Sequence, residues 1–289
     1  MTGEGFALLA ALAYGLAGVT IVRGKATAQG DNGVFLSVAV TAAVSGALWL
    51  GWGQVAAASL ATPGAVLPIA IFIAAGLFSM VLGRRTMYRA TEQIGPVATS
   101  LLRRLTPVFA LPLGVIFLAE VPGAKTLLGA VLVIAAVLIY IGRPSEPRGG
   151  AAGGWWLGVG SAAFYAMSYA LRSGGLDRLP DAALGTLIGA GAGMIWMLSA
   201  ALARGRVRAL LVDRGPWHWL TAFALSAGQI FQFFALKSAS VVVVATLGSL
   251  EVFFTALLGV ALLGRPAAGL WRLILPAGVA VVGTALMVW

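Results

Sequence analysis

Residues 94–118 read IGPVATSLLRRLTPVFALPLGVIFL, and two arginines are the only charged residues in this stretch. A helix of about 20 apolar residues crosses the roughly 30 Å hydrocarbon core of a bilayer. Nine other stretches of this kind occur along the chain, three before it and six after it. The ten predicted spans are 4–22, 32–52, 65–85, 94–118, 124–141, 154–172, 182–203, 216–237, 239–263 and 268–288. The sequence therefore predicts an all-α integral membrane protein with ten transmembrane helices.

The composition agrees with this prediction. Of 289 residues, 60% are hydrophobic and 10% are charged, whereas a soluble domain has about 25% charged residues. The net charge of +10 is typical of a membrane protein with basic cytoplasmic loops, and no basic stripe with interleaved aromatic residues indicates a nucleic-acid partner. Because the chain has no cysteine and one histidine, His218, neither a metal site nor a cofactor is expected.

The fourth predicted span has a counterpart in the second half of the chain. Residues 239–263 read ASVVVVATLGSLEVFFTALLGVALL, and an ungapped overlay of residues 88–120 on residues 233–265 gives nine identical positions. A Gly/Pro segment at 143–153 separates a first five-helix repeat, 1–142, from a second, 154–289. Because each repeat has an odd number of helices, the second enters the membrane in the opposite direction, an inverted repeat that many secondary transporters share.

The basic residues predict the orientation. Odd-numbered connections carry thirteen of them and even-numbered connections four. The first set is Arg23, Lys25, Arg84, Arg85, Arg89, Arg143, Arg148, Arg204, Arg206, Arg208, Arg214, Arg265 and Arg272, and the second is Lys125, Arg172, Arg178 and Lys237. Positive residues favour the cytoplasm, so we expect a bacterial-type inner-membrane protein with both termini on the outer side.

Three features together resemble a known family. These are the five-plus-five order, the first-helix sequence GFALLAALAYG at 5–15, and the fourth-helix ends LAEVP at 118–122 and LGRP at 263–266. The chain resembles the EamA type of the drug/metabolite transporter superfamily over essentially its whole length. This resemblance implies export or exchange of a small metabolite through a central cavity, and it does not name the cargo. The sequence departs from the resemblance at Arg103-Arg104, where apolar or small residues are expected, and at Pro107 and Glu120, whose counterparts are Val252 and Arg265.

Three ionisable residues stand out within the predicted spans: Arg103, Arg104 and Glu251. Each such residue costs about 2.5 to 3.5 kcal/mol on insertion scales, so it needs a partner or a function. In the overlay Glu251 corresponds to Thr106, close to both arginines, which predicts that the three meet near the membrane midplane. Three interpretations stay open: a cargo-binding and proton-coupling site, a structural ion pair, or arginines that anchor at the interface. If the arginines face the cavity, the cargo has an anionic group.

Other side chains are candidates for the cavity wall. Gln229 and Gln232 are one helical turn apart and either bind a polar cargo or bond neighbouring helices. Tyr14 and Tyr165 occupy matching positions in the first helix of each half, and either line the cavity or pack in the core. Trp196 is deep in the seventh span, where it either stacks on cargo or packs.

Two patterns concern helix geometry. Pro107 and Pro112 predict kinks in the fourth span, which can serve as hinges for alternating access. Gly185, Gly189 and Gly193 recur every four residues, a spacing that predicts close helix packing within the chain.

The predicted function is a secondary transporter, an exporter or exchanger, of a small metabolite with an anionic group, such as an amino acid, an organic acid or a phosphorylated compound. The chain has no Walker motif, so ATP is not expected to drive transport directly. A flippase for a lipid or lipid-linked anionic headgroup is the alternative. A membrane-embedded enzyme is disfavoured because no acid/base pair or His-Glu-x-x-His motif is present. We expect a monomer or a homodimer.

Overall fold

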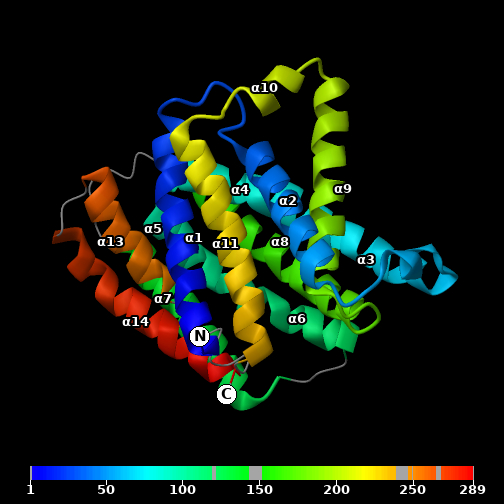
Figure 1. Cartoon of the computed structure of the whole chain (residues 1–289). Helices are drawn as coiled ribbons and strands as arrows, with labels where there is room; N and C mark the ends of the chain where they lie inside the picture. The colour runs from blue at the N-terminus through cyan, green and yellow to red at the C-terminus, as the bar shows by residue number, and fades with distance from the viewer. Residues whose placement is uncertain are drawn as a thin grey trace.

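The computed structural model describes residues 2–118, 122–142, 152–238, 247–248, 250–264 and 268–288. Within these ranges the chain is a bundle of helices joined by turns, without a β-strand (Figure 1). Most of the predicted linker, together with Glu120 and Arg265, lies outside the described residues. In the view of Figure 1 the two termini lie at the same end of the bundle.

The first half contains two interrupted helices. The uninterrupted ones are α1 (Gly3–Lys25), α2 (Val34–Trp52) and α7 (Ala124–Gly142), and two short 3₁₀ turns, η1 (Ala57–Ala61) and η2 (Pro63–Ala65), follow α2. The third span consists of α3 (Val66–Gly76), a π-helical segment η3 (Leu77–Gly83) and α4 (Arg84–Ile94). The fourth consists of α5 (Pro96–Leu102), a 3₁₀ segment η4 (Arg103–Leu105) and α6 (Thr106–Leu118).

The second half contains mostly long helices. They are α8 (Ala152–Leu176), α9 (Ala182–Leu202), the short α10 (Val207–Leu211), α11 (Pro216–Ser238), α13 (Glu251–Leu263) and α14 (Ala268–Val288). Residues 239–246 of the predicted ninth span lie outside the described part.

Among the described residues, four helical stretches are long and apolar enough to cross a membrane. They are Gly3–Lys25, Val34–Trp52, Pro63–Ile94 and Ala182–Leu202, and three shorter apolar helices are Ala124–Tyr140, Glu251–Leu263 and Leu273–Met287. The helical fold and these spans agree with a membrane protein. The count of ten spans and the inverted relation of the halves stay predictions.

The end of the third span and the placement of two arginines differ from the prediction, because hydropathy is a poor guide where charged residues continue a helix. The third span was expected to end at residue 85, but α4 continues to Ile94 and ends at Gly95, whose φ of +85° favours glycine. Arg84 was assigned to a connection and is instead buried at the start of α4. Arg172, also assigned to a connection, lies within α8. Removing both arginines from the charge count does not change the direction of its bias.

Close helix contacts depend on glycine. A Cβ on Gly76 of α3 would lie 2.3 Å from the Cα of Gly189 on α9, so the two backbones touch. A Cβ on Gly185 or Gly193 would likewise meet Phe72 or Met80. The four-residue glycine pattern of α9 therefore packs within the chain, as predicted. Elsewhere in the bundle, α1 packs along α11 and α7 along α14 (Figure 1).

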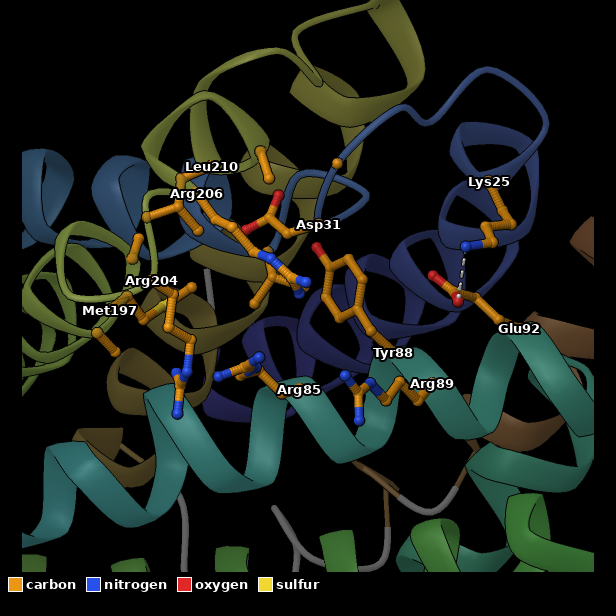
Figure 2. Close-up of a pocket in the computed structure, with 15 residues that line it drawn as sticks. Lys25, Asp31, Arg85, Tyr88, Arg89, Glu92, Met197, Arg204, Arg206 and Leu210 are labelled. Atoms are coloured by element: carbon orange, nitrogen blue, oxygen red, sulfur yellow. Dashed lines mark ion pairs between the residues drawn. The ribbon is translucent and has the colours of Figure 1, made fainter.

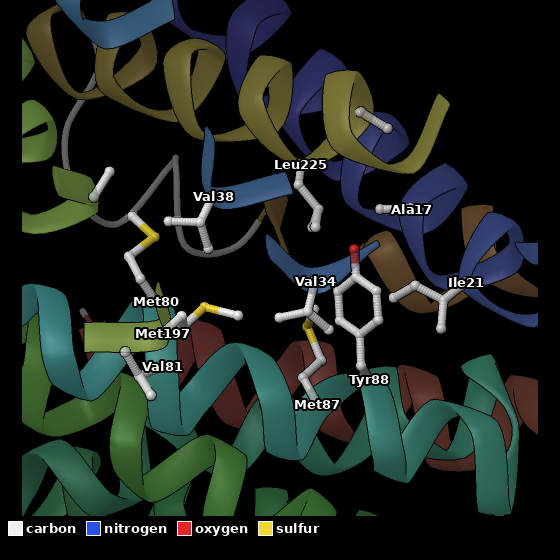
Figure 3. Packing of buried hydrophobic residues seen from close by; sticks show 12 residues of the cluster. Ala17, Ile21, Val34, Val38, Met80, Val81, Met87, Tyr88, Met197 and Leu225 are labelled. Atoms are coloured by element: carbon white, nitrogen blue, oxygen red, sulfur yellow. The ribbon is translucent and has the colours of Figure 1, made fainter. Parts of the chain in front are cut away.

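A methionine-rich cluster fills the interior between α1, α2, η3, α4, α9 and α11. Met80, Met87 and Met197 meet Val38 and Tyr88 there (Figure 3), and each of these five side chains is at most 4% exposed. Methionine is flexible and tolerates repacking. We call this group the methionine cluster. A second core, around Leu101, Val133 and Val252, fills the other side of the bundle.

Candidate functional site

The fourth span changes helix type at the arginine pair. Pro96 begins α5 after Gly95, and the chain tightens into the 3₁₀ segment η4 at Arg103–Leu105 before α6 begins. A 3₁₀ segment in mid-helix often marks a functional hinge. Pro107 and Pro112 both lie in α6, after the 3₁₀ segment. The irregular segment therefore contains the two arginines and not the two prolines. Their role as hinges stays a prediction.

Both arginines bind one carboxylate. Arg103 Nη1 lies 2.8 Å from Glu251 Oε1, and Arg104 Nη2 lies 2.7 Å from Glu251 Oε2. Ser100 Oγ donates a third hydrogen bond to Glu251 Oε1 at 3.1 Å. The Glu251 side chain is 4% exposed and each arginine side chain 13%. The three residues that the overlay placed at one level therefore meet inside the bundle, and we call them the arginine–glutamate cluster.

Two tyrosines enclose Arg103. Its guanidinium carbon lies 5.3 Å from the ring centre of Tyr14 and 5.5 Å from that of Tyr165, within the range of cation–π attraction. The Tyr14 hydroxyl donates a hydrogen bond of 3.1 Å to Gln232 Oε1. The first helices of the two halves thus each contribute one tyrosine to the same guanidinium, and α11 supports one of them.

Two other sequence candidates lie apart from this cluster. Gln229 lines a cavity whose wall contains none of the residues of this cluster, and its Nε2 has no hydrogen-bond partner among the described residues. Trp196 is 54% exposed on α9, which favours contact with lipid.

Sequence reasoning missed two further interior arginines. Arg84 is 4% exposed, and its Nη1 lies 3.2 Å from Ser37 Oγ and 3.3 Å from Thr41 Oγ1. Arg172 Nη2 lies 3.3 Å from Ser79 Oγ. Both arginines stand close to the ends of apolar runs, where a basic residue suggests an interface anchor. The spacing of Ser37 and Thr41, one helical turn apart within an apolar helix, was the available signal of a buried polar partner.

The region around the arginine–glutamate cluster has more cations than anions. Arg84, Arg103, Arg104 and Arg172 lie there with one carboxylate of the described residues, Glu251. The other buried carboxylates, Asp181 and Asp213, accept hydrogen bonds from backbone N–H groups of the helix connections. Arg172 interacts electrostatically with Arg84, Tyr14 and Tyr165, so the four arginines belong to one connected region. Hydroxyl partners satisfy guanidinium N–H groups without neutralising the charge. Buried charges usually have a counter-ion, so this region is suited to accept a mobile anion.

Comparison with known proteins identifies the family. Residues 1–142 match the sequence model of the EamA-like transporter family. The chain belongs to the drug/metabolite transporter superfamily. One crystal structure shares 18% sequence identity with this chain and superposes with a TM-score of 0.66. The match covers 99% of this chain and 96% of the chain in that structure, and it shows similarity of fold. No curated protein matches the chain significantly. The protein is therefore an integral membrane transporter of the drug/metabolite type.

In this transporter two cavities lie toward opposite ends of α2 and α9. One, of about 560 Å³, is lined by Val34 of α2, Met197 of α9 and several basic residues (Figure 2). We call it the cationic pocket. The other, of about 590 Å³, is lined by residues such as Thr41 and Leu48 of α2 and Thr186 of α9. We call it the apolar cavity.

The methionine cluster separates the two cavities. On α2, Val38 of this cluster lies between Val34 of the cationic pocket and Thr41 of the apolar cavity. On α9, Ala190 of the cluster lies in the same way between the residues that line the two cavities. The bundle is thus open toward each end and filled in its middle.

Proposed function

We propose that this protein is a secondary transporter, an exporter or exchanger, of a small metabolite with a carboxylate or phosphate group, and that Arg103 and Arg104 bind this group. The observation that carries the proposal is that, among the described residues, four arginines share one connected region of the interior with a single carboxylate, Glu251. A guanidinium fork matches a carboxylate or phosphate with two parallel hydrogen bonds.

Exchange at Glu251 gives a mechanism for this binding. Glu251 pairs with both arginines, so an incoming anion competes with it for the same N–H groups. A displaced Glu251 would be a buried carboxylate without a counter-ion, a state that costs about 3 to 5 kcal/mol. Binding of one proton to Glu251 removes this cost. Cargo binding and proton binding are then linked, which is what a proton-coupled carrier requires.

The separated cavities support alternating access. Each opens toward a different end of α2 and α9, and the methionine cluster between them can repack with little loss of contact. The irregular segments η3 and η4 are next to buried arginines, where local changes of helix type can absorb movement. From the distribution of basic residues, we place the cationic pocket at the cytoplasmic end of the bundle, in a bacterial-type inner membrane.

Matched probes test the charge requirement. We expect glutamate to raise the thermal midpoint of the purified protein more than glutamine, and glycerol 3-phosphate more than glycerol, if these anions resemble the cargo. Any anion that stabilises the protein is then tested for exchange in proteoliposomes. The variant Arg103→Gln/Arg104→Gln should lose the preference for glutamate over glutamine and the exchange of the stabilising anion, and Arg178→Gln, which replaces an exposed arginine outside the cluster, should keep both. Stabilisation by neutral probes alone, unchanged in the double variant, would falsify the proposal.

A further inference from the structure

We propose that the cationic pocket is a binding site for a phosphate-type oxyanion, separate from the arginine–glutamate cluster. This site does not depend on the cargo proposed above, because none of the residues that line it belongs to that cluster. The proposal rests on the charge of the pocket, on one buried hydroxyl group and on the way the pocket wall is held.

The charge of the pocket is positive and largely uncompensated. Four arginines from α4 and the α9–α10 connection face one another across it (Figure 2), and in the described part of the chain none has a carboxylate within 4.0 Å. These are Arg85, Arg89, Arg204 and Arg206. Arg85 is repelled by both Arg89 and Arg204, and the attraction of Asp31 offsets only part of this repulsion. Because like charges one helical turn apart repel, an anion placed between these arginines would be attracted by all of them.

The acidic residues of the pocket are already engaged. Glu92 pairs with Lys25 at 3.3 Å. Asp31 accepts hydrogen bonds from the backbone N–H groups of Gly33 at 3.0 Å and Phe35 at 2.8 Å, so it holds the start of α2. Neither carboxylate is close enough to form an ion pair with the four arginines. These guanidinium groups therefore remain available for a ligand.

Tyr88 supplies a hydrogen-bond donor of a different kind. It lines the pocket from α4 between Arg85 and Arg89 (Figure 2) and is 1% exposed. Its hydroxyl is near the Ser37 side chain but makes no hydrogen bond of 3.5 Å or less among the described residues. A buried hydroxyl without a partner is unfavourable and calls for an explanation. An oxyanion bound by the neighbouring arginines would accept this hydrogen bond.

Hydrogen bonds within the protein hold the pocket wall that the α1–α2 connection forms. Asp213 accepts hydrogen bonds from the backbone N–H groups of Gln29, Gly30 and Asn32 at 2.7, 3.0 and 2.6 Å. These bonds hold the α1–α2 connection, which contributes Gly30 and Asp31 to the pocket, against the segment before α11. A preorganised wall lowers the entropic cost of binding.

The size of the pocket indicates a phosphate carried by a larger molecule. A volume of about 560 Å³ exceeds that of one phosphate ion several-fold. A phosphorylated metabolite and the headgroup of an anionic lipid share this chemistry, and anionic lipids are concentrated at the cytoplasmic surface. Inorganic phosphate is the minimal probe of the shared group, and lipid vesicles distinguish the two sources.

The test uses the full chain in an uncharged detergent. We expect inorganic phosphate to raise the thermal midpoint relative to chloride at equal ionic strength. Its affinity should fall at least tenfold in Arg85→Gln/Arg89→Gln and about tenfold in Tyr88→Phe, which removes only a hydroxyl and retains the packing of the ring. The control Arg208→Gln removes a nearby exposed arginine that does not line the pocket, and it should respond like the wild type.

A second arm replaces phosphate by vesicles of phosphatidylglycerol or phosphatidylcholine. Preference for phosphatidylglycerol that the pocket variants lose, without a response to free phosphate, supports the site and identifies a lipid headgroup as its ligand. Absence of both responses overturns the proposal. So does a phosphate response that Arg103→Gln/Arg104→Gln abolishes and Tyr88→Phe leaves unchanged, because the anion then binds at the arginine–glutamate cluster.

Discussion

Replacing Glu251 by glutamine keeps the shape of the side chain and removes its charge. The wild-type carboxylate accepts hydrogen bonds from Arg103, Arg104 and Ser100 at 2.8, 2.7 and 3.1 Å. The amide of Glu251→Gln leaves both guanidinium groups without a counter-ion. Loss of one partner of a buried ion pair costs about 3 to 5 kcal/mol. Because each arginine side chain retains 13% exposure, we take the lower end, about 3 kcal/mol, which corresponds to a fall of roughly 6 to 12 °C in thermal midpoint.

Thermal unfolding of the purified variant, followed by tryptophan fluorescence in an uncharged detergent, measures this effect. Glu4→Gln is the matched control, because Glu4 is exposed in the first turn of α1. The double variant Arg104→Gln/Glu251→Gln should be less destabilised than the sum of the single variants. An anion that binds the arginines should restore part of the lost stability of Glu251→Gln. A midpoint at or above that of the wild type would refute the reasoning, because the arginines would then not depend on the carboxylate.

Three further predictions follow from other contacts. Tyr14→Phe removes the hydrogen bond to Gln232 and keeps the ring beside the arginine, so it should cost about 1 kcal/mol in unfolding free energy by denaturant titration and preserve anion binding. Gly76→Ala forces α3 from α9 and should destabilise by about 1 to 3 kcal/mol, whereas Gly191→Ala points into open space on α9 and should be neutral or slightly stabilising in the same titration. Burial raises the pKa of Asp31 to about 6, so this side chain loses its negative charge as the pH falls through that value. Sulfate keeps its own charge in this pH range, so calorimetry should show that it binds the cationic pocket more tightly at the lower pH. The variant Asp31→Asn should bind sulfate with an affinity that depends less on pH.

The groups that act on Asp31 set the sign of this last effect. Burial is the main cause of the raised pKa, the nearby Asp213 adds to it, and Arg85 together with the backbone N–H groups of Gly33 and Phe35 opposes it. The pocket also contains five cations and one other acid, namely Lys25, Arg89, Arg204, Arg206, Arg85 and Glu92. Neutralising Asp31 therefore makes the pocket more positive. A sulfate affinity that is constant or falls toward low pH would contradict this assignment.

Hydropathy predicted the helices well where the chain is uniformly apolar. The bounds of α2 and α9 differ from the predicted spans by at most two residues. It failed at α4, where Arg84 and its charged neighbours lower the mean hydropathy although the backbone stays helical until Gly95. The Gly95-Pro96 pair was the better signal of that boundary, because positive φ at glycine and the missing N–H of proline both interrupt a helix. A π-helical segment such as η3 has no composition of its own, so residue types alone do not reveal it.

The overlay of the two halves was the strongest predictor of the candidate site. It placed Glu251 close to Arg103 and Arg104, and the structure brings the three into contact. It could not find Arg84 or Arg172, because their partners are hydroxyl groups on other helices. Serine and threonine are common in apolar helices and bond their own backbone there, as Thr41 also does. Such residues give little sequence signal that they also bind a buried cation.

The position of Glu251 answers a difficulty that any carrier with several buried arginines faces. A site that binds an anion through two guanidinium groups tends to hold it too tightly, and transport requires release as well as capture. Glu251 competes for the same N–H groups. It weakens cargo binding by the free energy of its own ion pairs, and it reoccupies the arginines when the cargo leaves. Loss of this carboxylate should therefore strengthen anion binding while it slows turnover, a combination that separates an exchange partner from a purely structural ion pair.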